Sequence, residues 1–186
     1  IGTTDAPLSD RGRMDLRKLD YEYKYPGTQV VFTSPLKRCT ETAKILYPEQ
    51  NPLVIDNLSE CNFGEWEGKT ADELKNDPDF KKWLAGDSSV KPPRGESNAD
   101  FTRRVFKMFE SIVEGLMKTG TTESVIVTHG GVIMTLLAVY GLPQAKPFEW
   151  TMDNGFGYSL RVTPVLWQRD KVCEVFQTIP LPSEND

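Results

Sequence analysis

Apolar residues in this chain alternate between short continuous runs and longer stripes with helical spacing. The runs Gln29–Thr33, Leu53–Ile55 and Val125–Thr128 are mostly β-branched, aromatic or aliphatic, and each predicts a short strand, the last of them buried. Over Ser97–Met117 the apolar positions recur every three or four residues, which predicts a long helix with one face toward the core. The members of that stripe are Phe101, Val105, Met108, Ile112 and Leu116.

Polar residues that commonly cap helices stand just before several of the other apolar segments. A side-chain oxygen at such a position accepts a backbone N–H that the first helical turn leaves free. We expect helices to begin at Ser9, Ser34, Thr70, Asp77 and Ser97. At Ser34 the hydroxyl would be the cap and the following proline would occupy the first helical position.

The last third of the chain predicts one more helix and a pair of strands. Val132–Tyr140 is an apolar helix, and Tyr158–Val162 and Val172–Ile179 are two strands, antiparallel and at a sheet edge. We expect the polar tail Pro180–Asp186 to be frayed. The whole pattern predicts a three-layer α/β/α fold, with a mostly parallel central sheet and an antiparallel edge, as a single domain over residues 1–186.

The composition narrows the classes of function. The 186 residues carry a net charge of −5, so nothing favours binding to nucleic acid or to an anionic membrane surface. The three cysteines are widely spaced and odd in number, which fits a reducing, cytoplasmic compartment rather than a disulfide framework. With one histidine and no paired cysteines, no metal site is expected, and no apolar run is long enough to span a membrane.

Candidate chemistry gathers where the predicted strands end. Ser34 and Arg38 follow the first strand, Glu60 follows the second, and His129 follows the third. An arginine suits a phosphate because its planar fork makes two charge-assisted hydrogen bonds. After the histidine, Gly130 and the next glycine let backbone approach a ligand closely, and free amides at a helix start favour an anion.

The carboxyl group of Glu60 is a candidate proton donor. If Phe63 and Trp66 formed an apolar wall beside it, they would help to keep it protonated. Each candidate also has an ordinary interpretation: Arg38 and Glu60 as exposed surface residues, and the two aromatic residues as core that anchors a loop. The segment Gly95–Ser97 alone would be only a loop leading into a capped helix.

The order of these segments resembles the histidine phosphatase superfamily, the phosphoglycerate-mutase-like proteins. Five blocks in the order of that family cover nearly the whole chain, and they hold its phosphate-binding arginine, its acid and its second histidine at Arg38, Glu60 and His129. The blocks are Gly2–Gly12, Thr33–Ala43, Leu58–Gly68, Gly95–Ser97 and Val127–Gly131.

One feature departs from the family. Its members open with a strand ending in Arg-His-Gly, whose histidine becomes phosphorylated, and the 186 residues contain no such segment. Either this strand lies upstream of Ile1, or the protein lacks it and is catalytically inactive. We favour the first, because losing a strand from inside a sheet leaves buried backbone groups unpaired. The prediction is therefore an interrupted sheet beside Val125–Thr128; a continuous sheet would contradict it.

The resemblance implies a phosphoric monoester hydrolase that works through a phosphohistidine. Glu60 would protonate the leaving oxygen and then activate water, while Arg38 and His129 stabilise the phosphoryl group. Gly2, Thr3 and Gly130 are expected to contact the substrate, a small phosphorylated metabolite. No metal or other cofactor is implied.

The substrate is a finer inference. The stretch between Gly68 and Gly95 is shorter than the insertion that phosphoglycerate mutases of the family tend to carry there, which favours an open site and hydrolysis. The compact chain looks most like the α-ribazole-5′-phosphate phosphatases of cobalamin assembly. Phe80, Trp83 and Trp150, together with Trp66, would be either an aromatic lid or ordinary core. The alternatives are a broad small-molecule phosphatase, a phosphoglycerate mutase and an inactive phosphate-binding homologue.

Overall fold

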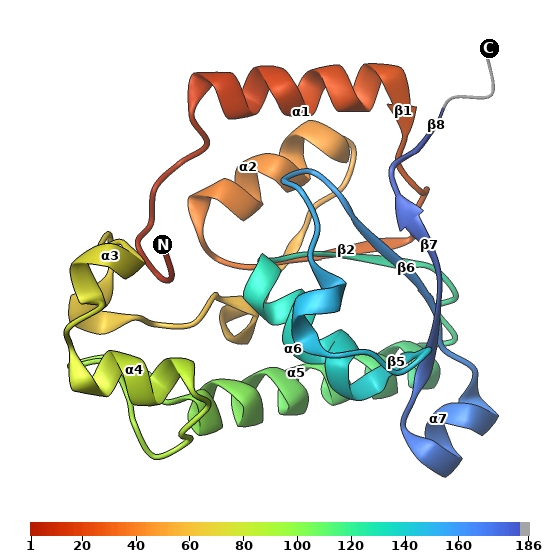
Figure 1. Cartoon of the computed structure of the whole chain (residues 1–186). Coiled ribbons are helices and arrows are strands. Elements are labelled where there is room, and N and C mark those ends of the chain that lie inside the picture. The colour runs from red at the N-terminus through yellow and green to blue at the C-terminus, as the bar shows by residue number, and fades with distance from the viewer. Residues whose placement is uncertain (183–186) are drawn as a thin grey trace.

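The computed structural model describes residues 1–182 and is an α/β fold in three layers (Figure 1). Helices α1 and α2 lie on one face of a parallel sheet, and α5 and α6 lie on the other, so the predicted fold class is confirmed. The sheet has the strand order β3-β2-β4. The bounds are β2 (Val30–Thr33), β3 (Leu53–Val54), β4 (Ser124–Val127), α1 (Asp10–Glu22), α2 (Lys37–Leu46), α5 (Asn98–Thr119) and α6 (Gly130–Tyr140).

The register of this sheet brings three chain turns to one edge. Thr33 at the end of β2 pairs with Val127 at the end of β4 and with Val54 at the end of β3. The carboxyl ends of parallel strands therefore lie side by side, which is the edge where ligands bind in open α/β sheets. Ser34, Glu60 and His129 all come after these strand ends.

A second, mixed sheet contains the predicted antiparallel pair. Its order is β5-β7-β6, so β7 lies in the middle of it instead of at an edge. The polar tail is not frayed at Leu181–Pro182 (β8), because these residues pair with β1 (Tyr23–Lys24); residues 183–186 lie outside the described part of the chain. The bounds are β5 (Gly141–Leu142), β6 (Gly157–Arg161) and β7 (Cys173–Ile179), with a helix α7 (Pro164–Asp170) that the sequence analysis missed.

The sheet is interrupted as predicted. Within residues 1–182 no ladder joins β4 to the strands of the second sheet, and both β4 and β6 are paired on one side only. The expectation that Val125–Thr128 is a buried strand is wrong, because all four residues of β4 are half-buried. A strand with one neighbouring strand keeps more of its surface accessible than a strand with two.

Most of the predicted helix starts are confirmed. The hydroxyl of Ser9 accepts the amide of Gly12 at 3.0 Å, and Thr70, Asp77 and Ser97 also cap helices with their side chains. Ser34 does not, because α2 begins at Lys37. The amide of Lys37 donates instead to Oδ1 of Asp5 at 2.7 Å, so a residue from the N-terminal loop supplies the cap.

The main core lies between the sheet and the pair α5 and α6. The predicted stripe of α5 packs there against Leu58 and the apolar face of α6. A smaller cluster of Trp66, Leu74 and Phe80 holds the short helices α3 (Ala71–Leu74) and α4 (Pro78–Leu84). Short 3₁₀ turns occupy Asp56–Leu58, Gly64–Trp66 and Pro147–Trp150 (η3).

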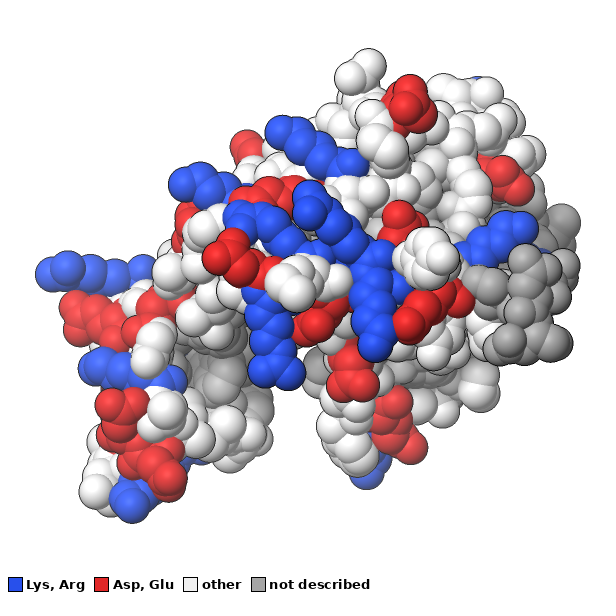
Figure 2. Space-filling view, turned by 90° about the horizontal axis from the view of Figure 1, so that it is seen from above, with Lys and Arg blue, Asp and Glu red and all other residues white. Residues whose placement is uncertain are grey.

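The surface over α1 mixes both signs of charge. Figure 2 looks down on this face and shows Lys and Arg side chains with Asp and Glu side chains among them. Arg11 pairs with Asp15 and Lys18 with Glu22 along the helix. In the described part of the chain, no helix combines the length and the apolar character that a membrane crossing requires.

Candidate active site

Arg38 lies one helical turn after the end of β2 and reaches the N-terminal segment. Its Nη1 donates to the carbonyl oxygen of Thr4 at 2.8 Å, and its Nη2 donates to that of Gly2 at 2.6 Å. A guanidinium group has five N–H donors, so further donors remain for an anion. The contacts fix the direction of the side chain, and pre-orientation of this kind favours ligand binding.

The N-terminal segment is held from its other side by Glu67. Its carboxylate accepts the amides of Gly2 at 2.8 Å and Thr3 at 2.7 Å, and also the Thr4 hydroxyl at 2.9 Å. Burial alone would raise the pKa of Glu67, but these hydrogen bonds lower it below its ordinary value. Gly2 leaves no room for a side chain, because a Cβ there would overlap the carbonyl oxygen of Cys61. Residues 2–4 thus lie between a fixed cation and a fixed anion.

Glu60 lies against the start of α6. Its Oε2 accepts the amide of Gly131 at 2.9 Å, and its Oε1 accepts the amide of Cys61 at 3.0 Å. A Cβ at position 131 would lie 2.9 Å from Cδ of Glu60, so only glycine permits this approach. The sequence analysis valued this glycine for its closeness to a ligand; in the structure it gives closeness to the candidate acid.

An ion pair fixes the loop that carries Glu60. Arg104 on α5 binds both carboxylate oxygens of Glu96, at 2.8 and 2.9 Å, and both side chains are largely buried. The same guanidinium group donates to the carbonyl oxygens of Asn57, Ser59 and Glu60. Arg104 is thus a positioning residue for the loop, and Glu96 in the predicted Gly95–Ser97 segment is its partner.

His129 is buried at the end of β4, between β2 and α2. Its Nε2 lies 2.8 Å from the hydroxyl oxygen of Ser34 and 3.5 Å from the Cys39 sulfur. Burial, and then the positive charges of Arg38 and Arg104, lower the pKa of His129 to about 4. The imidazole is therefore neutral at pH 7 when no anion is bound, and it can donate one hydrogen bond but offers no charge.

The thiol beside this histidine is not a nucleophile. Burial raises the pKa of Cys39 to about 12, so the sulfur stays protonated at neutral pH. The same holds for Cys61, where burial also raises the pKa to about 12. Among residues 1–182, no group of three or more His, Cys, Asp or Glu side chains is arranged to hold a metal ion.

The two aromatic residues that were expected to flank Glu60 lie in different parts of the structure. Trp66 belongs to the small buried cluster, where it packs edge-on against Phe80 with ring centroids 5.3 Å apart. Phe63 lines a pocket of about 410 Å³ together with Glu60 and Trp83. The wall interpretation therefore applies to Phe63 and the core interpretation to Trp66. Trp150 packs against Tyr158 and is also core.

The candidate residues are linked by contacts at one edge of the sheet. Arg38 donates to the carbonyl oxygen of Gly2, and Gly2 lies against Cys61, the residue after Glu60. Glu60 in turn accepts the amide of Gly131, two residues after His129. The exposed amide of Gly130 has no acceptor among the residues that the structure describes. The structure thus brings the predicted site residues into one neighbourhood.

Sequence reasoning missed the residues that hold this neighbourhood together. Arg104 carried no distinctive signal, because Lys107 stands beside the core position Met108 just as Arg104 stands beside Val105. Glu67 carried none for its contacts with the N-terminal segment, because those partners are 63 to 65 residues away. Ser34 was predicted as a helix cap and placed at the same sheet edge, but its hydrogen bond with the histidine was not predicted.

Comparison with known proteins adds a family to this geometry. A model of the histidine phosphatase superfamily, branch 1, matches residues 1–173. Phosphoserine phosphatase 1 of Hydrogenobacter thermophilus is 30% identical over 159 residues, which cover 82% of this chain and 74% of that protein.

Solved structures agree with the fold. The α-ribazole phosphatase of Shigella flexneri superimposes with a TM-score of 0.77 over 98% of this chain and 87% of its own, at 22% identity. A phosphoglycerate mutase of Thermus thermophilus gives a TM-score of 0.63 at 31% identity, over 84% of this chain and 79% of that one. At 22% identity the first likeness concerns the fold alone.

Proposed function

Since the chain belongs to the histidine phosphatase superfamily, branch 1, we propose that it hydrolyses small phosphomonoesters through a phosphohistidine intermediate. The observation that carries the proposal is the contact chain that runs from Arg38 through Gly2 to Glu60 and the start of α6. It puts a cation, a carboxyl group and a neutral imidazole at one sheet edge.

In the first step an imidazole nitrogen attacks phosphorus while the ester P–O bond breaks. Glu60 delivers its proton to the departing oxygen. Arg38 binds the phosphoryl oxygens, and the Gly130 amide and His129 are further donors to them, with Gly2 and Thr3 bordering the site. The attacking histidine would belong to the Arg-His-Gly strand of the family, which is not among these 186 residues. The open sides of β4 and β6 support a place for such a strand between them.

In the second step Glu60 takes a proton from water, the water oxygen bonds to phosphorus, and the P–N bond breaks. The products are inorganic phosphate and free imidazole. General acid–base assistance of this kind contributes about 10²–10⁴ in rate. Bound phosphate carries negative charge, so its binding also raises the pKa of His129 from its low value in the free protein.

Phosphate affinity tests the anion site directly. We expect Arg38→Ala to weaken the binding of inorganic phosphate at least tenfold in calorimetry, and Glu60→Gln to retain it. Lys37→Ala is the matched control, because that neighbouring side chain is exposed. Equal affinity in Arg38→Ala and the control contradicts the proposal.

Turnover separates the related functions. A phosphatase releases phosphate from α-ribazole 5′-phosphate or a simple aryl phosphate, whereas a mutase moves phosphate between positions of phosphoglycerate. An inactive homologue binds phosphate but forms no acid-labile phosphoryl-protein. For a protein that includes the attacking histidine we expect release, and we expect Glu60→Gln to slow it, because that variant can neither protonate the leaving oxygen nor activate water.

A further inference from the structure

The pocket beside Glu60 is lined on one side by α5. It is walled by aromatic and aliphatic side chains from five different segments of the chain. Phe63 and Trp83 meet there edge to face, with ring centroids 5.7 Å apart. The other apolar contributors are Phe101, Met134 and Pro147.

Neutral polar groups supply the remaining walls. Asn98, Thr102 and Thr135 line the pocket, and none of their side chains makes a hydrogen bond to another residue in the described part of the chain. Hydroxyl and amide groups without partners at a pocket wall can pair with hydroxyl groups of a ligand.

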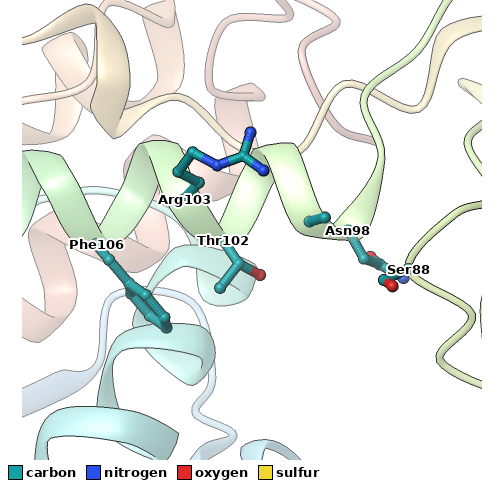
Figure 3. Close-up of a pocket in the computed structure, with 6 residues that line it drawn as sticks. Ser88, Asn98, Thr102, Arg103 and Phe106 are labelled. Carbon is teal, nitrogen blue, oxygen red and sulfur yellow. The ribbon is translucent and has the colours of Figure 1, made fainter.

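Charge is the distinctive property of this pocket. Of the described residues that line it, only Glu60 is charged. A neighbouring hollow of about 490 Å³ shares Asn98 and Thr102 with it and has Arg103 at its border. In Figure 3 the Arg103 guanidinium lies on the other side of α5 from Phe106 and Thr102, and it pairs with Asp100 at 2.8 Å. It does not supply a cation to the pocket.

We propose that this pocket holds the alcohol part of the substrate and selects uncharged, ring-containing alcohols over carboxylated ones. The inference rests on the proposed function, because Glu60 belongs both to the pocket and to the proton transfer. An apolar ring gains from contact with Phe63, Trp83 and Met134, and a volume of about 410 Å³ has room for one. A carboxylate would face the carboxyl group of Glu60 with no cation to compensate it.

Binding of stable phosphonates tests this selection without turnover. We expect benzylphosphonate to bind the protein at least tenfold more tightly than inorganic phosphate, and 3-phosphonopropionate to bind no more tightly than phosphate. Met134→Trp fills the pocket and should abolish the advantage of the benzyl group. Val139→Trp is the matched control, because it lies on the same helix, is 50% exposed and does not line the pocket.

A second variant tests the same inference if Met134→Trp fails to fold. Thr135→Arg adds the missing cation, and we expect it to improve 3-phosphonopropionate binding at least fivefold, unlike Val139→Arg. The pocket inference is overturned if the benzyl group gives no advantage or if Thr135→Arg leaves the preference unchanged while inorganic phosphate still binds. If inorganic phosphate itself does not bind, the proposed function fails and the pocket inference fails with it.

Discussion

The carboxyl edge of the parallel sheet and the outer side of its strand β4 differ in how they are held. At the carboxyl edge, charged side chains reach across the chain to backbone groups: Arg38 to Gly2, Glu67 to the same segment, and Arg104 to the loop of Glu60. Within residues 1–182, β4 and β6 are the end strands of two separate sheets, and each pairs with a strand on one side only.

This difference teaches where the geometry of the site comes from. The turns that carry the candidate residues are positioned by bidentate and multiple hydrogen bonds to partly buried charged side chains, and these are among the stronger hydrogen bonds of proteins. The site therefore depends on a few named side chains more than on the continuity of the sheet. Removing one of them should cost more than weakening the sheet locally.

The largest effect should follow from removing Arg104. Arg104→Ala leaves Glu96 buried without its partner and three carbonyl oxygens without a donor, which is expected to lower the free energy of unfolding by about 3–5 kcal/mol. Urea unfolding measures it. Arg103→Ala is the control, since that residue is exposed and its ion pair with Asp100 lies at the surface, and we expect a loss below about 1 kcal/mol. Equal losses in the two variants would show that the loop does not depend on Arg104.

A somewhat smaller effect concerns pH and the region around His129. Its pKa is about 4 in the folded protein and near 6.5 when unfolded, so the unfolded state binds more protons between these values. Stability should therefore fall as the pH falls from about 6.5 to about 4, by up to about 3 kcal/mol from this residue.

The contribution of His129 to this pH dependence is obtained by comparing the protein with a variant that lacks the imidazole. Carboxylates titrate in the same window, so unfolding free energies of the natural protein and of His129→Gln should be compared at pH 7 and pH 4. We expect the natural protein to lose more stability than the variant. Parallel pH profiles for the two would contradict a buried neutral imidazole.

The smallest of the three effects probes the N-terminal segment. Gly2→Ala places a methyl group against the carbonyl oxygen of Cys61, and overpacking of this kind costs about 1–3 kcal/mol. It should also weaken phosphate binding, because the segment contacts Arg38. Gly27→Ala serves as the control, since a Cβ there meets nothing within 4 Å. Unchanged melting in Gly2→Ala would mean that the segment is not tightly held.

What could be predicted from the sequence is what local chemistry determines. The caps at Ser9, Thr70, Asp77 and Ser97 bind amides two or three residues away, and all were found. The apolar stripe of α5 was predictable for the same reason, since it depends on residues three or four positions apart. The family blocks were recognised from their order along the chain. Arg38 and His129 were found because they lie close to the end of a strand and the start of a helix, and Glu60 was found from its block in the family order.

Contacts between distant segments were not predictable in the same way. The start of α2 is capped by Asp5, 32 residues earlier, so Ser34 is free to meet His129, 95 residues later. Residues Leu181–Pro182 pair with β1 across nearly the whole chain, which no local pattern indicates. Likewise, whether Phe63 or Trp66 faces Glu60 depends on how α3 and α4 fold back.

The single-sided pairing of β4 has a consequence for handling the protein. A strand with free N–H and C=O groups along one side is a template for a strand from another molecule. β4 adds three consecutive β-branched residues, Val125, Ile126 and Val127, that are only half-buried. We expect the upstream strand that the proposed function requires to cover this edge, so a protein that includes it should aggregate less in concentrated solution than these 186 residues alone.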